Sequence, residues 1–152
     1  MTSPAQQLAQ DERRKPFGNM RFRLEIDGLQ RTGALEVVFP EARVVRLSRK
    51  ARSIEYGTLS LRRGVTDSGE WFDWWDRSRR SNAPVKRNVA VILLDECGSD
   101  INRWTFVGAT PVGYLLSNLN ALGNEVLIET LELAIADLKA SFGSQGVSAK
   151  KK

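Results

Sequence analysis

The chain has 152 residues, a formal net charge of +5 at pH 7, one cysteine and no histidine. The absence of histidine excludes Ser-His-Asp and Cys-His catalysis and removes a common ligand of zinc sites. A single cysteine, Cys97, cannot form an intramolecular disulfide, which fits a reducing cytoplasm. No apolar run approaches the roughly 18 residues of a transmembrane helix, so we expect no membrane anchor.

The two ends of the chain differ in composition from its centre. Residues 1–16 are rich in glutamine and charged residues, which predicts a flexible N-terminal arm. Residues 143–152 end in three lysines and predict a flexible basic tail. Between them, residues 17–142 are long enough to form one domain with a core of its own.

The first part of this body has the pattern of strands. Apolar and charged residues alternate with period two over residues 17–26, which predicts a half-buried strand, and Asp27-Gly28 predicts a tight turn after it. Residues 35–47 form a weaker strand region that a proline interrupts. Residues 53–63 alternate again, and the change of phase at Gly57 predicts a bulge.

A helix is expected over residues 67–80. Asp67 stands where an N-cap is needed, and Glu70 follows at the spacing of a capping box. The helix carries three tryptophans on one face, Trp71, Trp74 and Trp75. Such a cluster could form a ligand cage, but it more often packs a lone helix onto a sheet. We therefore interpret the tryptophans as a helix-on-sheet anchor.

A hairpin is expected after the helix. Residues 88–94 and 103–107 have strand patterns, and Cys97-Gly98-Ser99 lies at the turn between them. Acidic residues flank this turn, but their spacing does not match a calcium-binding loop. We expect no metal site there.

The segment 125–140 has an ambiguous pattern. Leu127, Leu131 and Leu138 would share one face of a helix, and Asn124 could cap it. A strand would instead place Val126 and Ile128 on one face. Periodicity alone favours the helix.

Five basic residues fall within ten positions that contain no acid: Arg43, Arg46, Arg49, Lys50 and Arg52. They indicate a solvated surface, a surface that meets an acidic partner, or a nucleic-acid interface. The nucleic-acid interpretation is the weakest, because no aromatic residue for base stacking lies between Phe39 and Tyr56.

Several short segments occur in an order that is typical of one family. They are Phe22-Arg23-Leu24-Glu25-Ile26-Asp27-Gly28, Tyr56-Gly57-Thr58-Leu59-Ser60-Leu61-Arg62-Arg63-Gly64, Trp71-Phe72-Asp73-Trp74-Trp75 and the stretch from Leu119 to Leu133. With them the chain resembles, over residues 17–138, the inner tail tube proteins of contractile phages and phage-like contractile injection systems.

The resemblance implies a mainly antiparallel β-barrel or sandwich with one flanking helix near 67–80, and it implies a strand at 125–134. It also implies a structural role without catalysis or cofactors. Six copies would form a ring, and rings would stack into a tube inside a sheath. The implied partners are the chain itself, the sheath protein and baseplate or spike proteins, with cargo in the lumen and nucleic acid only as lumen content. Assembly would take place in the bacterial cytoplasm, before the tail or injection particle is complete.

One region departs from the family pattern. A glycine-rich, partly acidic hairpin in the family corresponds here to residues 41–53, which have no glycine and are strongly basic. This departure suggests an alternative role as a tube-initiating ring next to the baseplate; a more distant alternative is a basic nucleic-acid-binding β-barrel. The candidate subunit and ring interface consists of Arg43, Arg46, Arg49, Lys50, Arg52, Asn124 and Glu125.

Overall fold

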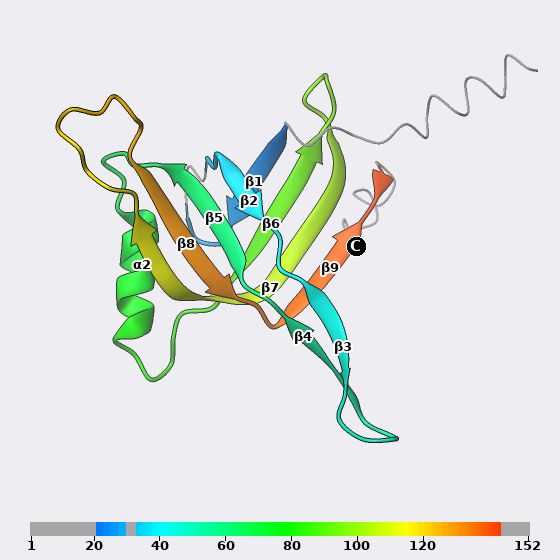
Figure 1. Cartoon of the computed structure of the whole chain (residues 1–152). Coiled ribbons are helices and arrows are strands. Elements are labelled where there is room, and N and C mark those ends of the chain that lie inside the picture. The colour runs from blue at the N-terminus through cyan, green and yellow to red at the C-terminus, as the bar shows by residue number, and fades with distance from the viewer. Residues whose placement is uncertain (1–20, 30–32, 144–152) are drawn as a thin grey trace, which may run out of the picture.

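The computed structural model describes residues 21–29 and 33–143 (Figure 1). The predicted arm 1–16 lies outside the described residues, as do residues 17–20 of the first predicted strand and the tail after Gly143. The elements are β1 (Phe22–Ile26), β2 (Glu36–Val38), β3 (Ala42–Arg46), β4 (Arg52–Tyr56), β5 (Leu59–Gly64), α2 (Glu70–Arg79), β6 (Arg87–Leu94), β7 (Asp100–Leu116), β8 (Ile128–Ala134) and β9 (Asp137–Ser141).

Strand β7 organises the main sheet. In the described part of the chain, seven strands form this sheet in the order β1-β6-β7-β8-β5-β2, and β9 also pairs with β7. The first part of β7 pairs with β6 and β9, and its last part pairs with β8, all antiparallel. The two halves of the sheet therefore face each other as a sandwich (Figure 1). This confirms the predicted fold class, mainly antiparallel β with one helix.

Gly108 lies where β7 passes from one half of the sheet to the other. Its φ of 64° is in the left-handed region, which side chains rarely adopt. A Cβ at this position would also lie 3.2 Å from the Cβ of Ala136. Glycine therefore allows the long strand to change direction without strain.

The core forms between the two halves because their strands alternate apolar and polar residues. Two inward positions of β5 and two of β8 are leucines, and Phe106 of β7 belongs to the same cluster. Helix α2 adds Trp71 and Trp74 to this cluster. Large aromatic and aliphatic side chains thus supply most of the buried apolar surface that holds the sandwich together.

Two local predictions were wrong. Gly57 is not a bulge: after Tyr56 the chain leaves the two-stranded sheet β3-β4, and at Leu59 it enters β5 of the main sheet. The change of phase marks this passage between sheets. The capping box is also absent, because Gly69 is the N-cap of α2 and no side chain caps it. Asp67 lies in the loop before the helix.

Segment 125–140 contains strands, so the helical interpretation of its periodicity is wrong. Strand β8 pairs with β5 on one side and with β7 on the other, and β9 follows it. Hydrogen bonding on both edges stabilises the extended form more than a helical apolar face could. The strand expected at 103–107 is also longer, since β7 has 17 residues.

Candidate assembly surfaces

The basic segment forms a hairpin that projects from the sandwich (Figure 1). Strands β3 and β4 pair only with each other, as a separate two-stranded sheet. An isolated two-stranded hairpin is marginally stable in water. Its base is held by the backbone N–H of Gly57, which donates to the Glu41 carbonyl at 2.8 Å, and by the Tyr56 hydroxyl, which donates to Asp137 Oδ1 at 3.1 Å.

The structure gathers all five predicted basic residues on this hairpin, and all five are exposed. Arg43 has a partner, because its Nε lies 2.8 Å from Glu41 Oε2. Arg46 and Arg52 are instead opposite each other in the strand register. The tip of the hairpin is therefore strongly positive.

The hairpin also exposes apolar side chains. Val44 and Ile54 are register partners, with 64% and 58% of their surfaces exposed, and Leu47 is exposed beside the turn. Apolar and positive groups on one projecting element are the composition of a protein-binding surface more than of a solvated loop.

Asn124 and Glu125 lie elsewhere, on the loop between β7 and β8. This β7–β8 loop (residues 117–127) is at the opposite end of the sandwich from the basic hairpin (Figure 1). The structure therefore does not bring the two sets of predicted interface residues together. The loop exposes Leu119 by 84% and Leu122 by 94%. Both belong to the stretch that resembles the family, but neither was among the predicted interface residues.

The tryptophans of α2 occupy different environments. Trp71 and Trp74 are buried in the core, and Trp74 Nε1 donates to the Val85 carbonyl at 2.8 Å. Trp75 is partly buried against the same cluster. Because two of the three rings are enclosed by the core, they do not line an open ligand cage.

A buried polar network under α2 was missed by sequence reasoning. Arg63 and Glu129 are register partners on β5 and β8, exposed by only 6% and 3%, and Arg63 Nε donates to Glu129 Oε1. The Tyr114 hydroxyl donates to Glu129 Oε2 at 2.6 Å. The Arg63 guanidinium lies 4.2 Å from the centre of the Trp71 ring. The period-two alternation of β5 could have revealed that Arg63 is buried, because Arg63 lies on the same face of the strand as Leu59 and the other β5 leucine.

Burial and the hydrogen bond to Glu129 raise the pKa of Tyr114 to about 12. Both causes favour the neutral phenol, because an ionised phenolate would be desolvated next to a carboxylate. Tyr114 therefore acts as a permanent hydrogen-bond donor at ordinary pH.

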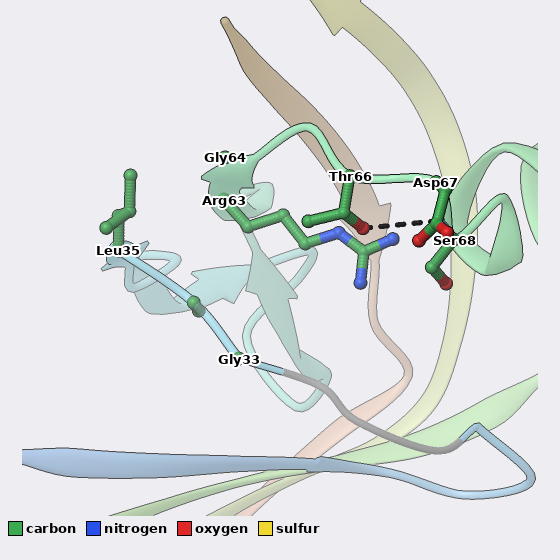
Figure 2. Close-up of a pocket in the computed structure, with 8 residues that line it drawn as sticks. Gly33, Leu35, Arg63, Gly64, Thr66, Asp67 and Ser68 are labelled. Atoms are coloured by element: carbon green, nitrogen blue, oxygen red, sulfur yellow. Dashed lines mark hydrogen bonds between the residues drawn. The ribbon is translucent and has the colours of Figure 1, made fainter. Parts of the chain in front are cut away.

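A pocket of about 560 Å³ opens beside Arg63. The residues around it are Gly33, Ala34, Leu35, Arg63, Gly64, Thr66, Asp67 and Ser68 (Figure 2). The guanidinium of Arg63 extends into it, toward Thr66, Asp67 and Ser68 (Figure 2). Arg63 Nη2 is buried, and the described residues offer it no hydrogen-bond acceptor.

Other kinds of site find no support in residues 21–29 and 33–143. They contain no group of three or more histidine, cysteine, aspartate or glutamate side chains that could hold a metal ion. Across the same residues, no helix has both the length and the apolar character needed to cross a membrane. Cys97 is a free, exposed thiol.

Solved structures share this fold. A chain of the anti-feeding prophage (AFP) baseplate matches with a TM-score of 0.63 and 24% identity over 84% of this chain and 97% of that one. A chain of the sheath-tube complex of the extracellular contractile injection system PVC matches with a TM-score of 0.64 and 18% identity, covering 93% and 99%. Hcp1 from Flavobacterium johnsoniae matches with a TM-score of 0.58 and 18% identity, covering 80% and 95%.

By sequence, no curated protein matches the chain. A family model does match: that of the T4-like virus tail tube protein gp19, over residues 18–139. This range takes in the sandwich, the helix, the basic hairpin and the β7–β8 loop. The chain therefore belongs to the T4-like virus tail tube protein gp19 family.

Proposed function

We propose that the chain is the ring-forming subunit of the inner tube of a contractile phage tail or injection system. Six copies form a ring, and rings stack inside a sheath. The observation that carries this proposal is the family match over residues 18–139, which includes nearly every described element.

The edges of the sheet support assembly. Strands β1 and β2 stand at the two ends of the strand order, so each has an edge without a partner among the described strands. Unpaired edges invite pairing with another chain. Joining such edges around a ring removes them, as closure does within a single barrel.

The two projecting elements support stacking. The basic hairpin and the β7–β8 loop lie at opposite ends of the sandwich (Figure 1). A contact between unlike surfaces of identical subunits is heterologous, and it can repeat without limit along an axis. Such contacts build a tube from rings.

A second candidate is the ring that initiates the tube on the baseplate. The observation that favours it is the hairpin tip, where Arg46 and Arg52 are opposed and exposed. A tip of this charge would select an acidic partner and reject a basic one. One similar solved chain comes from an AFP baseplate, which agrees with this candidate.

The proposal also includes partners and a location. The similar PVC chain comes from a sheath-tube complex, which supports a sheath partner for this chain. Baseplate or spike proteins would bind one end of the tube, and the lumen would hold cargo. The subunit would assemble in the bacterial cytoplasm before it becomes part of the particle. The role is structural rather than enzymatic.

Electron microscopy of the purified full chain, with light scattering for its mass, tests the proposal. We expect six-fold rings with a central hole. Rings that stack into tubes support the main tube role, and rings that never stack support the initiating ring. A protein that stays monomeric at high concentration contradicts both roles. Salt-dependent DNA binding by that monomer would favour the nucleic-acid-binding alternative.

A further inference from the structure

We propose that the basic hairpin of one copy docks on the acidic end of a second copy in the next ring, and that opposite charges set the direction of stacking. The acidic end consists of the three connections at the far end of the sandwich from the hairpin: residues 65–69, residues 95–99 and the β7–β8 loop. This contact rests on the proposed tube function, and it names the partner that the hairpin binds.

The three connections lie at one end because of the way the strands pair. Gly64, the last residue of β5, is opposite Ile128, the first residue of β8. The Val65 backbone N–H also donates to the Leu127 carbonyl at 2.8 Å, so residues 65–69 lie next to the β7–β8 loop. The turn between β6 and β7, at residues 95–99, lies at the same end of the sandwich (Figure 1).

The acidic end carries carboxylates without counter-charges. Its three connections contain no lysine or arginine, and among the described residues none of their acidic side chains forms an ion pair. These acids are Asp67, Asp95, Glu96 and Glu125. Arg21, directly before β1, is close to them, but its Nη1 donates to the backbone carbonyl of Glu96 at 2.8 Å. One guanidinium does not balance four carboxylates, so this end is negative.

The hairpin has the complementary surplus of positive charge. Of its five cations, only Arg43 has an ion-pair partner among the described residues, namely Glu41. Glu55, an exposed acid without an ion pair, is opposite Arg43 rather than at the tip. The cations without an ion pair are all exposed and lie toward the tip: Arg46, Arg49, Lys50 and Arg52. They can therefore meet the unpaired carboxylates of the acidic end.

Apolar side chains accompany the charges on both surfaces. The hairpin exposes the three apolar residues described above, and the β7–β8 loop exposes Leu119, Leu122 and Val126. Contact between these side chains would remove apolar area from water on both copies. The surrounding charges would steer the two copies together and fix their orientation.

Two unlike surfaces at opposite ends of one chain select a second copy as the partner. A contact of this kind is heterologous, and it can repeat without limit along an axis. Two hairpins, or two acidic ends, would instead bring like charges together, which is unfavourable. Rings can therefore stack only from hairpin to acidic end, and every ring of the tube points in the same direction.

Charge reversal at the acidic end tests the contact. Glu96→Lys/Glu125→Lys reverses two exposed carboxylates that bind no other described side chain, so the fold should be kept. We expect rings to form as in the unsubstituted chain, and the concentration needed for tube growth to rise about tenfold or more. Electron microscopy and sedimentation distinguish rings from tubes. The matched control Asp27→Lys/Glu55→Lys makes the same change in net charge at the hairpin end, and it should stack like the unsubstituted chain.

A charge swap provides the second test. Arg49→Glu/Lys50→Glu reverses the turn of the hairpin and should also impair stacking. When preformed rings of the two reversed variants are mixed, each reversed hairpin can meet a reversed acidic end, and each unchanged hairpin an unchanged one. We expect mixed tubes to grow at concentrations at which neither variant forms tubes alone. A mixture that stacks no better than its components would overturn the inference.

The outcomes separate the two proposals. If the unsubstituted chain forms tubes and Glu96→Lys/Glu125→Lys forms them equally well, the contact is refuted and the tube function stands. Loss of rings as well as tubes in this variant would place the charges within a ring and would also refute the contact. If the unsubstituted chain forms no rings, the proposed function fails, and the contact fails with it. Circular dichroism on each variant checks that the fold is kept.

Discussion

Arg46 and Arg52 face each other directly across the β3-β4 hairpin, and both side chains are exposed. Like charges at opposed positions destabilise a strand pair, by up to roughly 1 kcal/mol. The acid nearest in sequence, Glu55, lies opposite Arg43 closer to the base of the hairpin, and Glu41 is engaged by Arg43. The tip therefore keeps a concentration of positive charge that is unfavourable in the free subunit, which is understandable if an acidic partner covers it.

Charge reversal at the tip should separate folding from assembly. We expect Arg46→Glu/Arg49→Glu/Lys50→Glu to keep the thermal midpoint of the free subunit, because these side chains contact no part of the core. Assembly into tubes, or docking on a partner, should weaken strongly because the attraction becomes repulsion. Electron microscopy and sedimentation measure the assembled fraction.

A matched control carries the same change in net charge on another face. Arg77→Glu/Arg80→Glu/Lys86→Glu reverses three exposed residues on and after α2. It also breaks the exposed ion pairs of Arg77 with Asp73 and of Arg80 with Asp76, so its thermal midpoint is measured alongside its assembly. This control should assemble normally. If both triple variants assemble as well as the unsubstituted chain, the hairpin charge is only a solvated surface.

Removing the indole of Trp74 tests how α2 is held. Only 2% of the Trp74 surface is exposed, so Trp74→Ala leaves a large cavity. The substitution also removes the hydrogen bond that the ring nitrogen donates. We expect the free energy of unfolding to fall by about 3–5 kcal/mol. Urea unfolding measures the change. Trp75→Ala should lower the free energy of unfolding clearly less, because Trp75 is only partly buried. Equal losses from the two substitutions would refute the interpretation that Trp74 is the main anchor of α2.

The Arg63–Glu129 pair should show strong energetic coupling. Glu129→Leu removes the counter-charge of a buried guanidinium, and we expect a loss of about 3–5 kcal/mol. Arg63→Met/Glu129→Leu removes both charges and should be more stable than the Glu129→Leu single variant, because no buried charge remains alone. A double-mutant cycle by urea unfolding measures the coupling. Additive losses would show that the two charges act independently.

Sequence patterns predicted the half-buried strands well, and the reason is physical. β1 and β5 each have one face in the core, so their apolar residues alternate as the pleat requires. The same rule placed Arg63 and Glu129 on inward positions. The sequence analysis did not identify them as a pair, because the sequence does not show that the two residues meet across β5 and β8.

The errors arose where long-range contacts decide the structure. Leucines in segment 125–140 happen to fit a helical spacing, but β8 lies between β7, the strand before it, and β5, which is far away in the sequence. At Gly57, local alternation could not distinguish a bulge from a passage between two sheets. The family resemblance predicted the strand because it contains information about tertiary pairing that periodicity lacks.

Tyr114 provides a test of the buried network by pH. Its folded pKa of about 12 lies above the ordinary value near 10. The neutral phenol therefore contributes stability that is fully present below about pH 10 and is lost as pH rises through about 12. The chain has two tyrosines, so Tyr56→Phe leaves Tyr114 as the only one that titrates.

We expect the tyrosinate absorbance of folded Tyr56→Phe to rise near pH 12, and that of the same protein in urea to rise near pH 10. Circular dichroism on the same samples shows where the fold is lost. Tyr114→Phe should make the free energy of unfolding less dependent on pH between these values, because the group that loses its proton on unfolding is gone. Titration of folded Tyr56→Phe near pH 10 would mean that the Tyr114 hydroxyl is not held by Glu129, and the network under α2 would then consist of the ion pair alone.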